Sequence, residues 1–161
     1  MAADMFLVLD GAKGESRDDT YKDEIDVLAW SWGASQSGTM HTGGGGGAGK
    51  VNMQDLSVTK WVDKASPILF QKVASGKHFP KAKLICRKAG DNPVEYIVMT
   101  MEEVLISSVS TGGSGGEDTL TENISLNFSK IKFKYTPQTQ VGGAAADNEP
   151  GWDIAANTPW G

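Results

Sequence analysis

The sequence predicts a mainly β fold with one short helix, and two observations carry this prediction. Six runs of strand-forming residues are separated by clusters of Gly, Asp and Pro, as in short strands joined by turns. One further segment has both a helix start signal and a helix stop signal. With 161 residues, the chain is long enough for one hydrophobic core and too short for two. We therefore expect a single domain over residues 1–161.

The sequence predicts six strands, two of which are joined by a hairpin connection. The connection Asp91-Asn92-Pro93 is typical of a hairpin, so the strands on either side of it should pair in antiparallel fashion. In order, the six predicted strands are residues 5–9, 24–33, 56–61, 82–87, 94–108 and 123–135.

Residues 24–33 form the most informative strand, because both of its faces carry side chains suited to contact. Strand residues alternate between the two faces of a sheet. A strand that is apolar on both faces is either enclosed within the domain or covered by another molecule, and the second alternative implies assembly. One face would carry Ile25, Val27, Ala29, Ser31 and Gly33, and the other Asp26, Leu28, Trp30 and Trp32.

The helix is predicted between Ser66 and Gly76. Serine can cap free backbone amides, Pro67 fits the first turn, and glycine tolerates the left-handed conformation that ends a helix. The inward stripe would be Ile68, Leu69 and Val73, with Gln71, Lys72 and Ser75 facing water or a partner.

The run 123–135 changes parity near its middle. Its first half places Ile124, Leu126 and Phe128 on one face, whereas Ile131, Phe133 and Tyr135 fall on the other. A bulge near Ser129 would realign the two halves within the chain, and this is the alternative we favour because it needs no partner. Otherwise a neighbouring subunit would have to cover the second half.

Composition excludes several classes of protein. The net charge is −5, with acids concentrated in residues 15–26 and bases in 72–88, which opposes general binding to nucleic acid. This distribution suits head-to-tail contacts between unlike surfaces, although scattered solvated charge explains it equally well. We expect neither a signal peptide nor membrane insertion.

The single cysteine, Cys86, is expected to behave as a small buried hydrophobic residue in a protein made in a reducing compartment.

The sequence contains partial matches to three catalytic motifs, and each lacks a residue or a spacing that the chemistry requires. Residues 44–50 match part of a phosphate-binding loop, but Val51 replaces the hydroxyl residue that would hold magnesium. Ser114 lies in a Gly-x-Ser-x-Gly sequence, yet both histidines, His41 and His78, precede it. Glu102 and Glu103 are adjacent on a strand and cannot flank one glycosidic bond. We therefore predict no enzyme activity, no cofactor and no metal site.

Several segments together resemble the Hcp (haemolysin co-regulated protein) family, whose members form the inner tube of bacterial type VI secretion systems. The order and spacing of these segments are specific, while residues 138–149 carry little of the likeness. The segments are MAADMFLVLDGAKGES, EIDVLAWSWGASQSG, HTGGGGGAGKVNMQDLSVTKWVDKASP, SGKHFPKAKLICRKAG, VEYIVMTMEEVLISSVSTGGSGGEDTLTENISLNF and the terminal GWDI.

This resemblance implies a two-sheet β-barrel with one flanking short helix, six copies closing into a ring, and rings stacking into a tube. The implied partners are a contractile sheath outside, small effector proteins in the lumen and the valine-glycine repeat spike protein VgrG at the tip. The subunit would reside in the bacterial cytoplasm before the sheath contracts and would then be secreted. The alternatives are an effector-binding receptor or chaperone ring and a phage tail-tube-like protein.

The resemblance also assigns roles to particular residues. Ser31 is the candidate for contact with the lumen and with effectors, because a hydroxyl can face a wet channel. Gln71 and Lys72 are candidates for sheath contact. The variable tail begins at about residue 137, and the glycine-rich segment near 39–50 is either a flexible loop or an arm that orders against a neighbouring subunit or ring. The residues of this loop are His41, Thr42, Gly43, Gly44, Gly45, Gly46, Gly47, Ala48, Gly49 and Lys50.

Overall fold

The computed structural model describes residues 3–37, 50–90, 93–137 and 149–161. It confirms a mainly β fold and, within these residues, one helix. The strands are β1 (Ala3–Leu9), β2 (Ile25–Ser31), β3 (Ala34–Gln36), β4 (Val51–Met53), β5 (Leu56–Trp61), β6 (Phe79–Lys88), β7 (Glu95–Thr111), β8 (Thr121–Asn127), β9 (Lys130–Tyr135), β10 (Gly151–Asp153) and β11 (Thr158–Pro159), and the helix is α1 (Ser66–Ser75).

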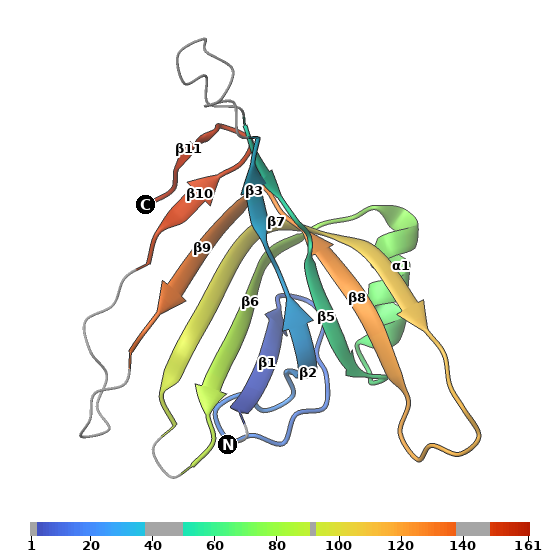
Figure 1. Cartoon of the computed structure of the whole chain (residues 1–161). Coiled ribbons are helices and arrows are strands. Elements are labelled where there is room, and N and C mark those ends of the chain that lie inside the picture. The colour runs from blue at the N-terminus through green and yellow to red at the C-terminus, as the bar shows by residue number, and fades with distance from the viewer. Residues whose placement is uncertain (1–2, 38–49, 91–92, 138–148) are drawn as a thin grey trace.

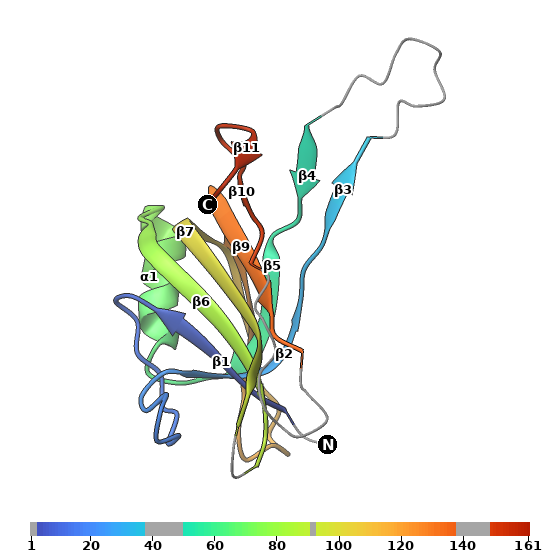
Figure 2. The same ribbon diagram turned by 90° about the vertical axis from the view of Figure 1, so that its left-hand side faces the viewer.

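Six of the strands close into an antiparallel barrel in the order β7-β6-β1-β2-β5-β8, because β8 pairs again with β7. Strands β9, β10 and β11 extend the sheet past β7, outside the barrel. Strands β3 and β4 form a separate hairpin that projects beyond one end of the barrel (Figures 1 and 2). The two-sheet barrel with one flanking helix is thus confirmed.

The long strand β7 connects the two parts of the sheet. Its first half pairs with β6 and β9, and its second half pairs with β8. Glu103 has φ 53° at the junction, a left-handed conformation that interrupts the alternation of faces. As a result Met101 and Val104, three positions apart, are both buried.

The predicted run 123–135 is realigned where we expected, at Ser129. Strands β8 and β9 follow the same edge of β7, and the backbone N–H of Ser129 donates to the carbonyl oxygen of Glu102 at 3.1 Å. On the two sides of this break, Phe128 and Ile131 are both buried. Neither residue therefore needs cover from a neighbouring subunit.

The predicted strand over residues 24–33 is present as β2, Ile25–Ser31, but the assignment of Val27, Ala29 and Ser31 to one face was wrong. The pairing of β2 with β5 shifts register between Val27 and Ala29, so Leu28 is the extra residue of a bulge. Before the bulge Val27 is buried, whereas after it Trp30 packs against the core and Ser31 is exposed. Ser31 therefore does not share a face with Val27.

The helix begins at Ser66 and ends before Gly76, as predicted, but Ser66 does not cap it. Ala65 occupies the N-cap position without a side-chain cap, and Gly76 ends the helix with φ 69° as predicted. Ser66 is the first helical residue, and its hydroxyl donates to Glu122 at 2.6 Å. Glu122 and Lys60 are both buried inside the barrel, so a polar cluster holds the helix start to β5 and β8. Sequence reasoning missed this cluster, although alternation places Lys60 on the same face of β5 as Leu56 and Val58.

The segment before β2 folds over the outer face of β1 and β6. The ring of Tyr21 stacks on Phe6 with centroids 4.9 Å apart, and the Arg87 guanidinium lies 5.0 Å from the Phe6 ring centroid. Arg87 also pairs with Asp18, while the hydroxyl of Tyr21 donates to Glu95. These contacts fix the acidic segment to the barrel wall.

Candidate functional site

A continuous surface of small, mostly polar side chains covers one side of the barrel, on β2, β5, β8 and the second half of β7. We call it the hydroxyl face. Strand pairing aligns its residues in two rows across the four strands. One row is Ser31, Ser57, Ser125 and Ser108, and the other is Ala29, Thr59, Asn123 and Ser110.

Alternation produces this surface. On β5 and β8 the residues of the two rows alternate with buried ones: Val58 lies between Ser57 and Thr59, and Ile124 lies between Asn123 and Ser125. The side chains of the rows therefore point away from the barrel interior. None of the eight side chains carries a formal charge. The result is a wet, neutral surface that can donate and accept hydrogen bonds.

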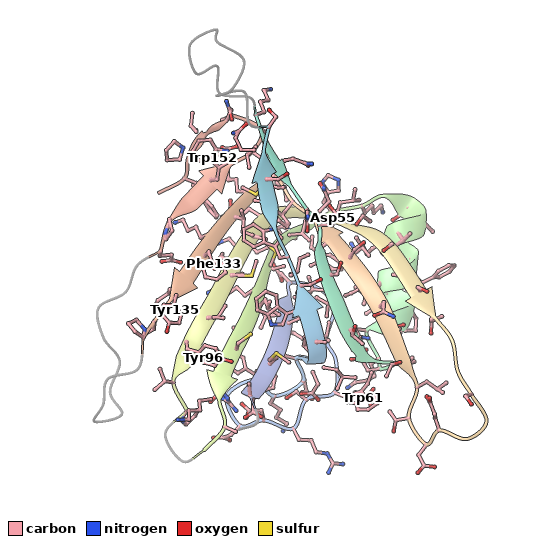
Figure 3. All side chains as sticks on the ribbon, in the orientation of Figure 1. Asp55, Trp61, Tyr96, Phe133, Tyr135 and Trp152 are labelled. Carbon is pink, nitrogen blue, oxygen red and sulfur yellow. The ribbon has the colours of Figure 1, made fainter. Side chains whose placement is uncertain are left out.

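Hydrogen bonds between strands hold parts of the hydroxyl face in place. The hydroxyl of Thr59 donates to Asn123 at 2.7 Å, and the hydroxyl oxygens of Ser108 and Ser125 lie 2.5 Å apart. At the end of the face nearest the hairpin, Asp55 accepts hydrogen bonds from Ser107 at 2.6 Å and from the Asn127 amide at 2.8 Å. Figure 3 shows Asp55 at this end and Trp61 at the other.

Ser31 occupies the end of the first row, at the β2 edge of the face. It is exposed, as its assignment to a wet surface requires. Trp30 and Trp32 pack against the core, as expected from their size. The sequence analysis identified Ser31 but not the other residues of the hydroxyl face, on β5, β7 and β8. The one sequence signal for these residues is the repeated placement of Ser, Thr and Asn beside apolar residues.

A second surface is an apolar groove of about 430 Å³ between the base of the hairpin and β9–β10. Trp32 stacks on Phe133 along one wall, with ring centroids 6.2 Å apart, and Met53 and Trp152 lie on other parts of it. Figure 3 shows Phe133 and Trp152 on neighbouring strands, beside the hairpin. The indole N–H groups of Trp32 and Trp152 are buried and have no hydrogen-bond partner among the described residues.

The outer face of α1 differs from expectation. Gln71 is exposed, as predicted. Lys72 is partly buried, because its ammonium lies 4.9 Å from the centroid of the Phe79 ring. Among the described residues, the most exposed large hydrophobic one is instead Phe70, at 67%, which the sequence did not single out.

Of the predicted assembly loop, only Lys50 belongs to the described residues. Residues 41–49 of the predicted assembly loop lie outside the described residues, as do residues 138–148 of the tail, whereas Lys50 is exposed just before β4. Within the described ranges, we find no cluster of three His, Cys, Asp or Glu side chains placed to hold a metal ion. The described helix is not one that could cross a membrane.

Comparison with known proteins gives consistent matches over nearly the whole chain. The model of the family described as "Type VI secretion system effector, Hcp" matches residues 6–135. Protein hcp1 of Pseudomonas aeruginosa is 60% identical over 161 residues, which cover 98% of this chain and 98% of that protein.

Solved structures show the same architecture. One, described as the structure of a type six secretion system protein, superposes with a TM-score of 0.92 at 33% identity, covering 99% of this chain and 100% of that chain. Hcp1 from Salmonella typhimurium superposes with a TM-score of 0.81 at 42% identity, with the same coverage.

Proposed function

Because this chain belongs to the Hcp family and is a subunit of the type VI secretion tube, we propose that its hydroxyl face lines the lumen of a hexameric ring. Cargo would then pass over the side of the barrel that carries Ser31. The observation that supports this assignment is the alignment of two rows of uncharged side chains across four strands, seven of the eight of them polar. The side chains of such a surface can form hydrogen bonds with a passing protein. Because none of them is charged, covering the surface with cargo buries no unpaired charge.

The action proposed for the subunit is mechanical. Contraction of a sheath outside the tube would expel the stacked rings and the VgrG spike, with small effectors held inside. In this scheme the subunit assembles in the cytoplasm and leaves the cell with the tube, and it breaks no covalent bond. The exposed Gln71 on α1 supports a sheath contact on this helix, whereas the contact of Lys72 with Phe79 makes its ammonium a weaker candidate.

The loop of residues 41–50 is proposed to contact a neighbouring subunit or the next ring. Its support is the position of its two ends, at the tip of the projecting β3–β4 hairpin (Figure 2). A two-stranded hairpin is marginally stable alone in water. Contact with another subunit would stabilise this one.

The hydroxyl face also supports a second role, as an effector receptor within the ring. The test is replacement of Ser31 by arginine, with Ser75→Arg at the exposed end of α1 as the matched control. We expect rings from all three proteins by native mass spectrometry and negative-stain microscopy. Only Ser31→Arg rings should lose an effector that copurifies with the wild type.

Two results would count against these proposals. A wild-type protein that stays monomeric at every concentration would contradict the ring. Unchanged cargo in intact Ser31→Arg rings would remove Ser31 from the effector contact while leaving the tube function in place.

A further inference from the structure

Asp55 carries the one formal charge in the hydrogen-bond network of the hydroxyl face, within the described residues. It lies directly before β5 and is half-buried, at the end of the face nearest the hairpin (Figure 3). The other members of this network are Ser, Thr and Asn side chains. A lone charge on a neutral surface decides which charged groups that surface attracts.

A chain of hydroxyl groups directs its protons toward Asp55. The hydroxyl of Ser107 donates to the carboxylate at 2.6 Å, so Ser107 can only accept from the hydroxyl of Ser125, 2.7 Å away. Ser125 in turn accepts from Ser108 at 2.5 Å, because each hydroxyl has a single proton. Aligned hydrogen bonds of this kind strengthen one another. The negative charge thus orders three hydroxyl groups of the face.

The carboxylate is held in place but is not neutralised. Its second oxygen accepts from the Asn127 amide at 2.8 Å, so each oxygen has one hydrogen bond. A carboxylate offers about four acceptor positions, and about two therefore remain. None of the ion pairs formed among the described residues includes Asp55. The nearby Lys60 of β5 points inward to Glu122 instead.

This unpaired charge makes Asp55 the exception on the hydroxyl face. Cargo that covers the two rows of uncharged side chains buries no charge, whereas cargo that covers Asp55 also covers a carboxylate. Burying a charge without a partner is strongly unfavourable. The penalty is offset when the cargo brings a positive group to the remaining acceptor positions, because charge-assisted hydrogen bonds are the strong ones.

We propose that Asp55 is a binding site for a cationic group of the cargo, either a lysine ammonium or an arginine guanidinium. This inference rests on the proposed function, and it adds the chemical class that the lumen selects. Ser107 and Asn127 are positioning residues, because they orient the carboxylate before the cargo arrives. A fixed carboxylate loses little conformational freedom on binding, which favours affinity.

The proposed ring would repeat this site at one level of the lumen. Copies of Asp55 related by the ring symmetry would surround the cargo near the hairpin end, and a channel lined by one sign of charge concentrates the field. A cargo segment with several basic residues would contact more than one copy, which raises its apparent affinity. An acidic segment would be repelled at the same level. Asp55 is therefore a residue that determines specificity.

The first test measures how wild-type rings and Asp55→Asn rings bind a defined cation. The probe is a short fluorescein-labelled peptide of alternating lysine and serine, compared with the same peptide after acetylation of every lysine. Fluorescence anisotropy at low salt should show that wild-type rings bind the lysine peptide about tenfold more tightly, as expected for one hydrogen bond to a charged group. Asp55→Asn should remove most of this preference, and high salt should weaken it in the wild type.

Two further variants separate the charge of Asp55 from its structural role. Asp10→Asn, at an exposed position after β1 and outside the hydroxyl face, changes the net charge equally and should keep the preference. Ser107→Ala removes a hydrogen bond of Asp55 but keeps the charge, and it should bind the lysine peptide within about threefold of wild type. Native mass spectrometry and melting curves check the rings and the folding of every variant.

The second test locates the contact in wild-type rings and does not depend on how the variants fold. A water-soluble carbodiimide joins a lysine of the probe to a carboxylate in contact with it through an amide bond, and the carbodiimide takes up the water that is lost. Trypsin then cuts after Lys50 and Lys60 and releases residues 51–60, in which Asp55 is the one acid. Mass spectrometry should find the lysine probe on this fragment, and the acetylated probe should give no such product.

The possible results separate the inference from the proposed function. Equal binding of the two peptides by wild-type rings, or cross-links confined to other fragments, would overturn the inference and leave the ring in place. So would a loss in Asp55→Asn that Asp10→Asn or Ser107→Ala matches. A wild type that forms no rings would overturn the proposed function itself.

Discussion

The Nζ atom of Lys60 lies 2.5 Å from a carboxylate oxygen of Glu122, and both side chains are buried within the barrel. Lys60 also lies 3.0 Å from Asp63 and donates to the carbonyl oxygen of Trp61 at 2.8 Å. The hydroxyl of Ser66 donates to the same Glu122 oxygen. Strands β5 and β8 and the start of α1 thus meet at one ionic cluster.

Neutralising Glu122 should destabilise the protein strongly, because a buried lysine would lose its closest counter-charge. We expect Glu122→Gln to lower the free energy of unfolding by about 3 kcal/mol, measured by urea denaturation at fixed protein concentration. Glu117→Gln, on an exposed turn, is the control and should change stability by less than about 0.5 kcal/mol. Equal effects of the two variants would contradict a stabilising role for the cluster.

Gly14 should not tolerate a side chain. An added Cβ would lie 2.8 Å from the carbonyl oxygen of Glu24 and 2.9 Å from the Cα of Ile25, and backbone atoms cannot easily move away. We expect Gly14→Ala to cost about 1–3 kcal/mol of unfolding free energy. Gly112→Ala meets nothing within 4 Å and should be nearly neutral in the same thermal unfolding experiment. A neutral Gly14→Ala would show that the segment shifts to make room.

Adjacent residues on α1 should respond oppositely to truncation. Leu69 is fully buried and Phe70 is 67% exposed. Leu69→Ala should therefore lower the unfolding free energy by about 2–5 kcal/mol, whereas Phe70→Ala should change it by less than about 0.5 kcal/mol. Comparable losses in chemical denaturation would mean that Phe70 packs against something in solution.

The Asp18–Arg87 pair should make stability depend on pH in the acid range. Partial burial by itself would raise the pKa of Asp18, but the hydrogen bond from Arg87, the backbone N–H of Tyr21 and the Arg87 charge hold it below its usual value of 3.8. Since the folded pKa lies below the unfolded one, the carboxylate contributes stability above the unfolded pKa. This contribution is lost as pH falls through the folded pKa.

The measurement compares wild type with Asp18→Asn between pH 7 and pH 2. We expect the wild type to be more stable at neutral pH and the difference to shrink as Asp18 is protonated. Asp19→Asn, at an exposed neighbouring position, is the control for a change of net charge. A difference that stays constant down to pH 2 would assign the effect to something other than this charge.

Periodicity was sufficient to predict much of the fold. The range of β5 and the end of α1 at Gly76 follow from alternation and from a glycine stop signal, which are local properties of the sequence. The realignment at Ser129 was also foreseeable, because a parity switch inside one strand demands a local irregularity. The bulge at Leu28 was not, because apolar residues stood on both faces and left no mismatch to detect.

The hydroxyl face depends on tertiary pairing, which a single sequence does not specify. Ser57, Ser108 and Ser125 are far apart in the chain and meet only through strand register. Lys72 shows the converse limit: its position on α1 suggested exposure, but the nearby Phe79 ring attracts its ammonium. A helical wheel does not include this contact, because Phe79 belongs to the following strand.

The burial of Cys86 has a consequence for the life of the assembly. It is the only cysteine of the chain, and burial raises the pKa of its thiol, which a hydrogen bond with Trp30 offsets in part. A protonated, inaccessible sulfur is a poor nucleophile and a poor target for oxidants. The subunit can therefore move from reducing to oxidising surroundings without disulfide exchange, and the durability of a tube would rest on noncovalent packing alone.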